Sequence, residues 1–212
     1  VTAPAGATVM TILEDLGIPH TEVGSVEING RPCTASARPS DGDEVTVRPA
    51  EPRVAPGDAP PRFILDVHLG RLARLLRLLG FDAVWSRDAA DADLAAAASR
   101  EHRVLLSRDR GLLTRREVLI GCLVRSQDPR RQLDEVADRY GLRGRLAPFS
   151  RCLVCNAPLG RSGSPPTDTA VRPSGGCPSC GRQYWRGSHW RSLNAVVEEI
   201  RGGAGHAPSG HA

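Results

Sequence analysis

The 212-residue sequence contains no lysine, one methionine and few aromatic residues (three Trp, two Tyr and three Phe), and it has no long apolar run. A helix that crosses a bilayer needs about 20 predominantly apolar residues, so we expect neither a transmembrane segment nor a signal peptide. We therefore predict no membrane partner. The sequence begins at Val1 and not at a methionine, which suggests that further residues precede it.

All 28 basic residues are arginine, and they are unevenly distributed. Residues 1–50 carry 7 acids and 3 bases (net −4), residues 62–148 carry 12 and 17 (net +5), and residues 149–191 carry 1 and 6 (net +5). The absence of lysine first indicates a biased genome composition. A basic, arginine-rich part is also typical of chains that bind a polyanion, although an ordinary solvated surface has the same composition.

Four of the six cysteines form two C-x-x-C pairs, C-L-V-C and C-P-S-C, with 21 residues between them. This pattern is a zinc signature, and four thiolate ligands would give a structural ion that is closed to substrate. Two disulfides are the alternative, but they require an oxidising compartment. We therefore predict a cytoplasmic protein whose zinc ligands are Cys152, Cys155, Cys177 and Cys180.

The chain divides into five segments by composition and pattern. Residues 1–50 combine a helical pattern with three short strands and an Asn-Gly turn, which predicts a β-grasp module. Residues 51–61 form a Pro-rich linker. Residues 62–148 alternate strands with helices, which indicates a parallel sheet flanked by helices, an α/β fold. Residues 149–192 are the expected zinc ribbon, and 193–212 a short helix with a disordered tail.

Four acids follow predicted strands of the central segment. Asp66 ends "FILD", Asp91 opens the helix after "DAVWS", Asp109 follows "RVLLS", and Asp128 follows "EVLIGCLVR". Ligands of α/β sheets bind beyond the carboxyl ends of the strands, so we expect the four carboxylates to converge there. Clustered carboxylates need a counter-charge, and Mg²⁺ or Mn²⁺ suits oxygen ligands. Two such ions can activate water and stabilise the leaving oxygen of a phosphodiester.

Each of these acids also has a structural alternative. Asp128 precedes a proline and is a good helix cap. Asp109 lies between two arginines and could be a turn residue. Asp91 could be a cap too, and its place could be taken by neighbouring acids, Asp88 or Asp93. Asp66 is the hardest to explain structurally, because a carboxylate directly after three apolar residues is costly to bury unless it is paired or metal-bound.

Basic and aromatic side chains supply candidate RNA contacts. Arg71, Arg74 and Arg77 recur every three residues on what we expect to be one side of a helix, and Arg108 adjoins Asp109. Aromatic residues alternate with arginines in "GRQYWRGSHW", a pattern that suits stacking on single-stranded nucleic acid, although a small ribbon also needs aromatic residues for packing. The candidate substrate-binding residues are Arg71, Arg108, Trp185, Arg186, His189 and Trp190.

Several of these motifs together resemble a known family. "FILDVHLGRLARLLRLLGFD", "RVLLSRDR", "LVRSQDP", "PFSRCLVCNAPL" and "CPSCGRQYWRGSHW" resemble the Mut-seven C-terminal type of PIN-like ribonuclease domain with its appended zinc ribbon. The likeness covers about residues 62–192. Residues 1–50, with "GIPHTEVGSVEINGRP" and "DGDEVTV", resemble the ubiquitin-like, sulfur-carrier-like domain that often precedes it.

The resemblance implies a PIN-type fold with an Mg²⁺- or Mn²⁺-dependent endoribonuclease centre. By motif, Asp66 matches the first-strand acid, Asp91 the helix-start acid and Asp109 the acid of the "T-R-D" segment, in which Ser107 replaces the threonine. Asp128 matches a later acid. The first domain lacks an opening strand, which suggests N-terminal truncation, and no Gly-Gly ends it before the linker. An adaptor role that binds a protein partner therefore fits it better than sulfur transfer.

Together these features predict a metal-dependent hydrolase that cleaves RNA phosphodiesters at a PIN-like acidic centre. RNA is the expected partner, with tRNA, rRNA and the ribosome as candidates. The alternative is a non-catalytic RNA- or ribosome-binding adaptor that uses the basic zinc ribbon.

Overall fold

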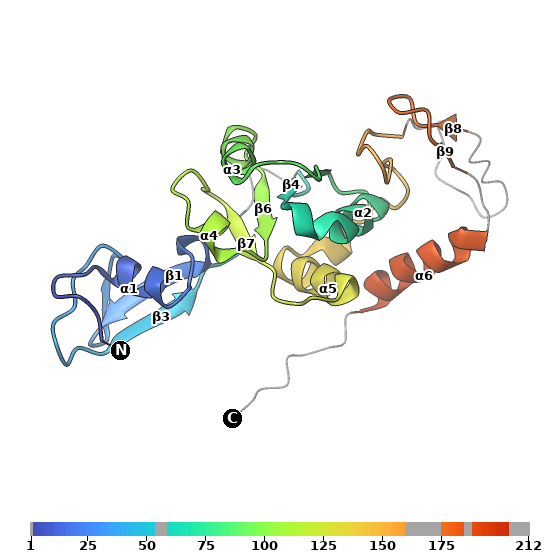
Figure 1. Cartoon of the computed structure of the whole chain (residues 1–212). Coiled ribbons are helices and arrows are strands. Elements are labelled where there is room, and N and C mark those ends of the chain that lie inside the picture. Colours follow the sequence, from blue (N-terminus) through green and yellow to red (C-terminus); the bar gives the residue numbers. More distant parts are fainter. Residues whose placement is uncertain (1, 54–58, 160–174, 185–187, 204–212) are drawn as a thin grey trace. The chain divides into compact units, whose positions relative to one another are not determined.

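The computed structural model describes residues 2–53, 59–159, 175–184 and 188–203 (Figure 1). The chain forms two compact units, each assembled from two stretches of sequence: Val1–Leu69 with Trp85–Arg125, and Gly70–Val84 with Ser126–Ala212. Among the described residues, no helix has the length and apolar character needed to cross a membrane.

The N-terminal module is a three-stranded antiparallel sheet, in the order β2-β1-β3, with one short helix. Asn29 and Gly30 have φ angles of 51° and 74°, as a two-residue type I′ hairpin turn requires, so the predicted strand–turn–strand is confirmed. Its elements are α1 (Val9–Asp15), η1 (His20–Glu22), β1 (Val23–Ile28), β2 (Arg31–Cys33) and β3 (Val45–Pro49).

A small apolar core holds this module together. Buried side chains of α1 pack on buried side chains of β1, and partly buried residues of all three strands complete the cluster of Val9, Leu13, Val23 and Val26. In the same unit, the buried Glu22 side chain accepts a hydrogen bond from the Leu123 amide at 2.8 Å, and its other oxygen lies 3.8 Å from Arg125. Strand β7 lies at the edge of its sheet, where backbone groups on the outer side have no neighbouring strand to pair with. The Glu22 carboxylate accepts a hydrogen bond from one of these groups, the Leu123 amide.

The second sheet has four strands in the order β5-β4-β6-β7. Pairings β4–β6 and β6–β7 are parallel, with Leu65 opposite Leu106 and Ser107 opposite Leu123. Every residue of β4 and β6 is buried, as expected for parallel strands covered on both faces. The predicted parallel α/β sheet is confirmed, and its strands are β4 (Phe63–Leu65), β5 (Ala83–Trp85), β6 (Val104–Ser107) and β7 (Gly121–Leu123).

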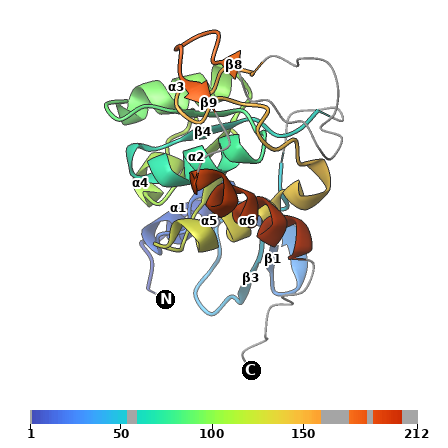
Figure 2. The ribbon, with the colours of Figure 1, turned by 90° about the vertical axis from the view of Figure 1, so that its right-hand side faces the viewer.

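Helices flank this sheet and continue into the C-terminal part. Helix α3 packs against β4 and β6, α4 against β6 and β7, and α2 against α5. An Arg130–Glu199 ion pair at 2.7 Å joins α5 to α6. Figure 2 shows the ribbons of these two helices. The helical segments are η2 (Val67–Leu69), α2 (Gly70–Leu78), α3 (Asp91–Arg100), α4 (Arg110–Leu113), α5 (Pro129–Arg139), η3 (Leu142–Arg145) and α6 (Ser188–Gly202).

Helix α2 ends at a glycine that the backbone requires. Gly80 has φ 96°, its amide donates to Arg77, and the Phe81 amide donates to Leu76, which together make a Schellman cap. A Cβ atom at Gly80 would lie 2.2 Å from the Ala147 carbonyl oxygen. The chain after η3 therefore crosses directly over the end of α2, and a side chain at this position would prevent that approach.

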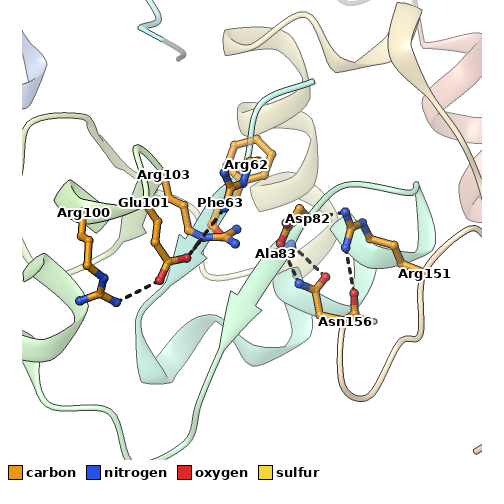
Figure 3. Close-up of polar contacts among 9 residues, drawn as sticks. All are labelled: Arg62, Phe63, Asp82, Ala83, Arg100, Glu101, Arg103, Arg151 and Asn156. Atoms are coloured by element: carbon orange, nitrogen blue, oxygen red, sulfur yellow. Dashed lines mark hydrogen bonds and ion pairs between the residues drawn. The ribbon is translucent and has the colours of Figure 1, made fainter. Parts of the chain in front are cut away.

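The amino ends of β4 and β6 are joined by a polar cluster (Figure 3). Arg103 is 6% exposed and donates to the Phe63 carbonyl at 3.3 Å and to Glu101 at 2.7 Å. Arg62 and Arg100 lie 3.9 Å and 3.1 Å from the same carboxylate. These contacts satisfy a buried guanidinium at the edge of the sheet opposite to the candidate acids, so we assign the cluster to fold stability.

Candidate active site and metal centre

Asp66 lies one residue beyond β4, at the carboxyl edge of the sheet. Its amide still donates to Leu106 at 3.1 Å, which continues the parallel ladder and fixes the position of the side chain. The residue is only 3% exposed. Its Oδ1 accepts the His68 amide at 2.8 Å, and its Oδ2 accepts the Arg108 amide at 3.1 Å and the Ser107 hydroxyl. Three donors thus hold a buried carboxylate in one orientation.

A carboxylate offers about four acceptor positions, so the three donors leave Oδ1 with one free for a water molecule or a cation. None of the three donors is a charged group, because two are backbone amides and one is a hydroxyl. These hydrogen bonds reduce the cost of burying the charge, but none of the described residues forms an ion pair with it. Asp66 therefore has the properties expected of a ligand for a cation.

Ser107 connects Asp66 to Asp109. The buried Ser107 hydroxyl donates to Asp66 and accepts the Asp109 amide at 2.8 Å, so the turn after β6 wraps around the carboxylate that ends β4. Asp109 itself is exposed and caps α4 by accepting the Gly111 amide at 2.7 Å. Strand pairing thus brings together two of the predicted acids that are 43 positions apart in the sequence.

The other two predicted acids have different environments. Asp91 is exposed in the first turn of α3, where the cap position is Ala90, so Asp91 is not the helix cap. Asp128 is exposed and does cap α5, accepting the Arg130 and Arg131 amides at 3.0 Å each. The structural role that the sequence allowed for Asp128 is therefore present.

The cysteines are grouped more tightly than the acids. We compare groups of three or more His, Cys, Asp or Glu side chains whose ligand atoms lie close enough to share one ion. In the part of the chain that the structure describes, the four cysteines form such a group. The carboxylates of Asp66, Asp91 and Asp109 form no second group of that kind there. Binding of one cation by these acids stays a prediction.

The predicted basic contacts differ in exposure. Arg71 is exposed on α2, and the Arg108 side chain is exposed at the carboxyl edge, so both are available to a phosphate. Arg77 is 3% exposed, and the expectation that it shares one side of the helix with Arg71 and Arg74 is wrong. A step of three residues turns an α-helix by about 300°, so residues six apart differ by about 120° in direction. Trp185 and Arg186, and the side chains of His189 and Trp190, lie outside the described part of the structure.

The four cysteine sulfurs form a compact cluster, within 4.8 Å of one another. The Sγ atoms of Cys152 and Cys180 are 3.6 Å apart, and those of Cys155 and Cys177 are 3.4 Å apart. Sulfurs around a tetrahedral zinc ion, with Zn–S of about 2.3 Å, lie about 3.8 Å from one another, whereas bonded disulfide sulfurs are about 2.05 Å apart. None of the four is in a disulfide, and the spacing of the sulfurs fits a zinc site better than it fits the disulfide alternative.

Each cysteine pair lies on its own backbone turn, and the two turns have the same hydrogen bonds. In the first turn, the Cys152 amide donates to the Ala157 carbonyl and the Asn156 amide donates to the Cys152 carbonyl. In the second turn, the Cys177 amide donates to the Arg182 carbonyl and the Gly181 amide donates to the Cys177 carbonyl. Asn156 and Gly181 have φ angles of 68° and 70°, the left-handed conformation that closes each turn. Asn156 was missed in the sequence, although an Asn or Gly directly after a C-x-x-C pair is a signal that could have found it.

Electrostatics at this cluster favour a bound cation. Burial acts to raise the pKa of Cys152, but hydrogen bonds from the Cys155 amide and the Tyr184 hydroxyl lower it to about 6. A hydrogen bond from the Arg182 amide acts to lower the pKa of Cys180, but burial and the neighbouring thiols raise it to about 12. Four adjacent thiolates repel one another, and a dication that binds all four removes this conflict.

The architecture defines a class of protein: an α/β domain with a buried acid at the carboxyl edge of its parallel sheet, followed by a cluster of four cysteines that could hold a metal ion. Residues 61–197 match the family model of the Mut7-C RNAse domain, and residues 2–55 match that of the Mut7-C ubiquitin domain. The chain therefore belongs to the Mut7-C RNAse domain family, with a ubiquitin-like domain before it. Searches of curated proteins and of solved structures gave no significant match.

Proposed function

We propose that this chain is a cytoplasmic endoribonuclease that hydrolyses RNA phosphodiesters with Mg²⁺ or Mn²⁺ bound by Asp66, Asp91 and Asp109. The observation that carries the proposal is the buried Asp66 carboxylate, held by three uncharged donors at the carboxyl edge of a parallel sheet. This is the edge where α/β folds bind their ligands. Membership of an RNAse domain family supports the same activity.

The proposed ligands contribute only carboxylate oxygens, which suits a hard divalent cation and no soft one. When bound, such an ion lowers the pKa of a coordinated water and stabilises charge on the phosphodiester oxygens. The chain's own residues orient these ligands. Ser107 and the Arg108 amide fix Oδ2 of Asp66, which leaves Oδ1 facing a single amide, that of His68.

RNA binding is assigned to arginine and aromatic side chains. The exposed Arg71 and Arg108 guanidinium groups would contact phosphates, and the aromatic residues after the second cysteine pair would stack on bases. tRNA, rRNA and the ribosome are the candidate partners. The paired cysteines support the proposed cytoplasmic location, since free cysteine pairs are typical of a reducing compartment. The ubiquitin-like domain would bind a protein partner.

The test is incubation of the full chain with labelled single-stranded and structured RNA, with Mg²⁺, with Mn²⁺ and with EDTA. We expect cleavage that requires the metal and falls by at least about 10²-fold in Asp66→Asn and in Asp109→Asn. Asp109 is exposed, so its variant separates catalysis from folding. Asp91→Asn should behave in the same way, whereas Asp93→Asn, changed two positions along the same exposed helix turn, should cleave normally.

The outcomes separate the enzyme from the adaptor. Wild-type cleavage that persists in Asp66→Asn and Asp109→Asn would refute the assignment of the site. Binding of RNA in EDTA, with no product in any metal, would instead support a non-catalytic adaptor that docks through its basic ribbon.

A further inference from the structure

Arg77 is a buried arginine in the last turn of α2, and its guanidinium group is directed at the first cysteine turn. Its Nε donates to the Ala83 carbonyl at 2.8 Å, and its Nη1 donates to the Leu153 and Val154 carbonyls at 3.2 Å and 2.8 Å. Leu153 and Val154 are the two residues between Cys152 and Cys155. A single side chain thus joins the start of β5 to the backbone of a metal-binding turn.

Asn156 makes the complementary connection from the other side (Figure 3). Its Oδ1 accepts the Ala83 amide at 3.1 Å, and its Nδ2 donates to Asp82 at 2.7 Å. Arg151 lies 3.6 Å from the same Asp82 carboxylate and donates to the Asn156 carbonyl at 2.9 Å. Ala83 is fully buried, and both of its backbone polar groups are therefore bonded to this network and not to water.

The hydrogen bonds from Arg77 and Asn156 depend on the shape of the cysteine turn. We expect the Leu153 and Val154 carbonyls to point at Arg77 only while the turn is closed, because four repelling thiolates oppose closure unless a cation binds them. Loss of the cation would release a buried guanidinium from two acceptors, which is costly. Burial lowers the pKa of Arg77, whereas negative charge on Cys152 and Cys155 acts in the opposite direction.

We propose that Arg77 and Asn156 are positioning residues for the cysteine metal site, and that through them metal occupancy and the hydrogen bonding of Ala83 in β5 depend on each other. The ribbon is then no independent module. Zinc stabilises the start of a strand of the RNAse sheet, and by thermodynamic reciprocity the RNAse residues raise the affinity for zinc. This inference does not depend on the proposed cleavage activity.

The first experiment measures zinc release from the full zinc-loaded chain to an excess of the chromogenic chelator 4-(2-pyridylazo)resorcinol. Removal of a group that orients metal ligands lowers metal affinity by about 10–100-fold. Because affinity changes appear mostly in the dissociation rate, we expect release to be about 10–100-fold faster in Arg77→Met. Asn156→Gly, which keeps the left-handed turn but loses the amide, should also be faster. The matched control is Arg103→Met, since Arg103 is equally a buried arginine bonded to a strand carbonyl, that of Phe63 in β4.

Unchanged release in both Arg77→Met and Asn156→Gly would overturn the proposal. Equal acceleration in Arg103→Met would overturn it too, because general destabilisation would then be the cause. Faster release in the two network variants alone would support it.

The second experiment needs no variant and therefore does not depend on how the substitutions fold. Amide hydrogen exchange of Ala83 is compared in the zinc-loaded chain and in the chain stripped with chelator under reducing conditions. We expect Ala83 to exchange at least about 10-fold faster without zinc. The Leu105 amide, bonded to Ile120 inside the sheet, should keep its protection. Equal protection of Ala83 in both forms would refute the coupling.

Discussion

Two substitutions of Asp128 distinguish a helix cap from a catalytic ligand. The Asp128 carboxylate accepts the Arg130 and Arg131 amides at 3.0 Å each, at the first turn of α5, where those amides have no partner within the helix. Asparagine caps a helix as well as aspartate does, whereas alanine does not. A cap therefore tolerates Asp128→Asn but not Asp128→Ala, while a metal ligand tolerates neither.

The magnitudes follow from the two hydrogen bonds and the exposure of the site. Loss of the cap in Asp128→Ala should cost about 1 kcal/mol, which lowers the melting temperature by about 2–4 °C in a chain of this size. Asp128→Asn loses only the interaction of the charge with the helix dipole, about 0.3–1 kcal/mol. Both variants should cleave RNA within about twofold of wild type at 25 °C.

Thermal unfolding followed by circular dichroism, together with the RNA cleavage assay, checks both parts. The reasoning fails if Asp128→Asn, with its stability intact, loses cleavage as severely as Asp109→Asn. Asp128 would then be a catalytic ligand as well as a cap. It also fails if Asp128→Ala unfolds at the wild-type temperature.

Three further predictions follow from other contacts. Hydrogen bonding from Arg103 lowers the pKa of Glu101 below its ordinary 4.5, so the ionised form stabilises the fold above that pH and this contribution is lost as the pH falls through the lowered value. Glu101→Gln should therefore lower the free energy of unfolding, measured with urea at pH 7, by about 1 kcal/mol, a modest value because the Glu101 side chain is 35% exposed. The difference in stability between the variant and the wild type should close below pH 4.5. A difference that stays constant across pH would contradict this. Gly80→Ala should destabilise the protein by about 2–3 kcal/mol, because the residue has φ 96° and a Cβ would meet the Ala147 carbonyl, whereas Gly144→Ala, with open space around it, should have almost no effect on the melting temperature. Tyr184→Phe removes a 3.0 Å hydrogen bond to Cys152 and should speed zinc release to a chelator by about 10-fold without changing the circular dichroism spectrum; wild-type release would show that the hydroxyl does not support the site.

The acids at the sheet edge show which features of the site the local sequence pattern could predict. The apolar run before Asp66 and the run before Ser107 were sufficient to predict two buried parallel strands, because a short continuous apolar stretch between helical patterns suits that environment. They also predicted that Asp66 and Asp109 would end at one edge. The donors that orient Asp66 were not predicted, since the Ser107 hydroxyl and Arg108 amide reach it only through strand pairing.

The sequence by itself determined the elements with strong local signals: the Asn-Gly hairpin, the buried strands, the Asp-Pro start of α5 and the paired cysteines. The hairpin, the strands and the helix start depend on neighbouring residues. The cysteine pairs are recognised by a spacing that is typical of a shared zinc ion. Tertiary structure decided the roles of the charged side chains whose partners are far away in the sequence. Arg77 has the same local pattern as the exposed Arg71, yet it is buried. The reason is that its partners, the Leu153 and Val154 carbonyls, are 76 and 77 positions away and exist as acceptors only where the cysteine turn packs.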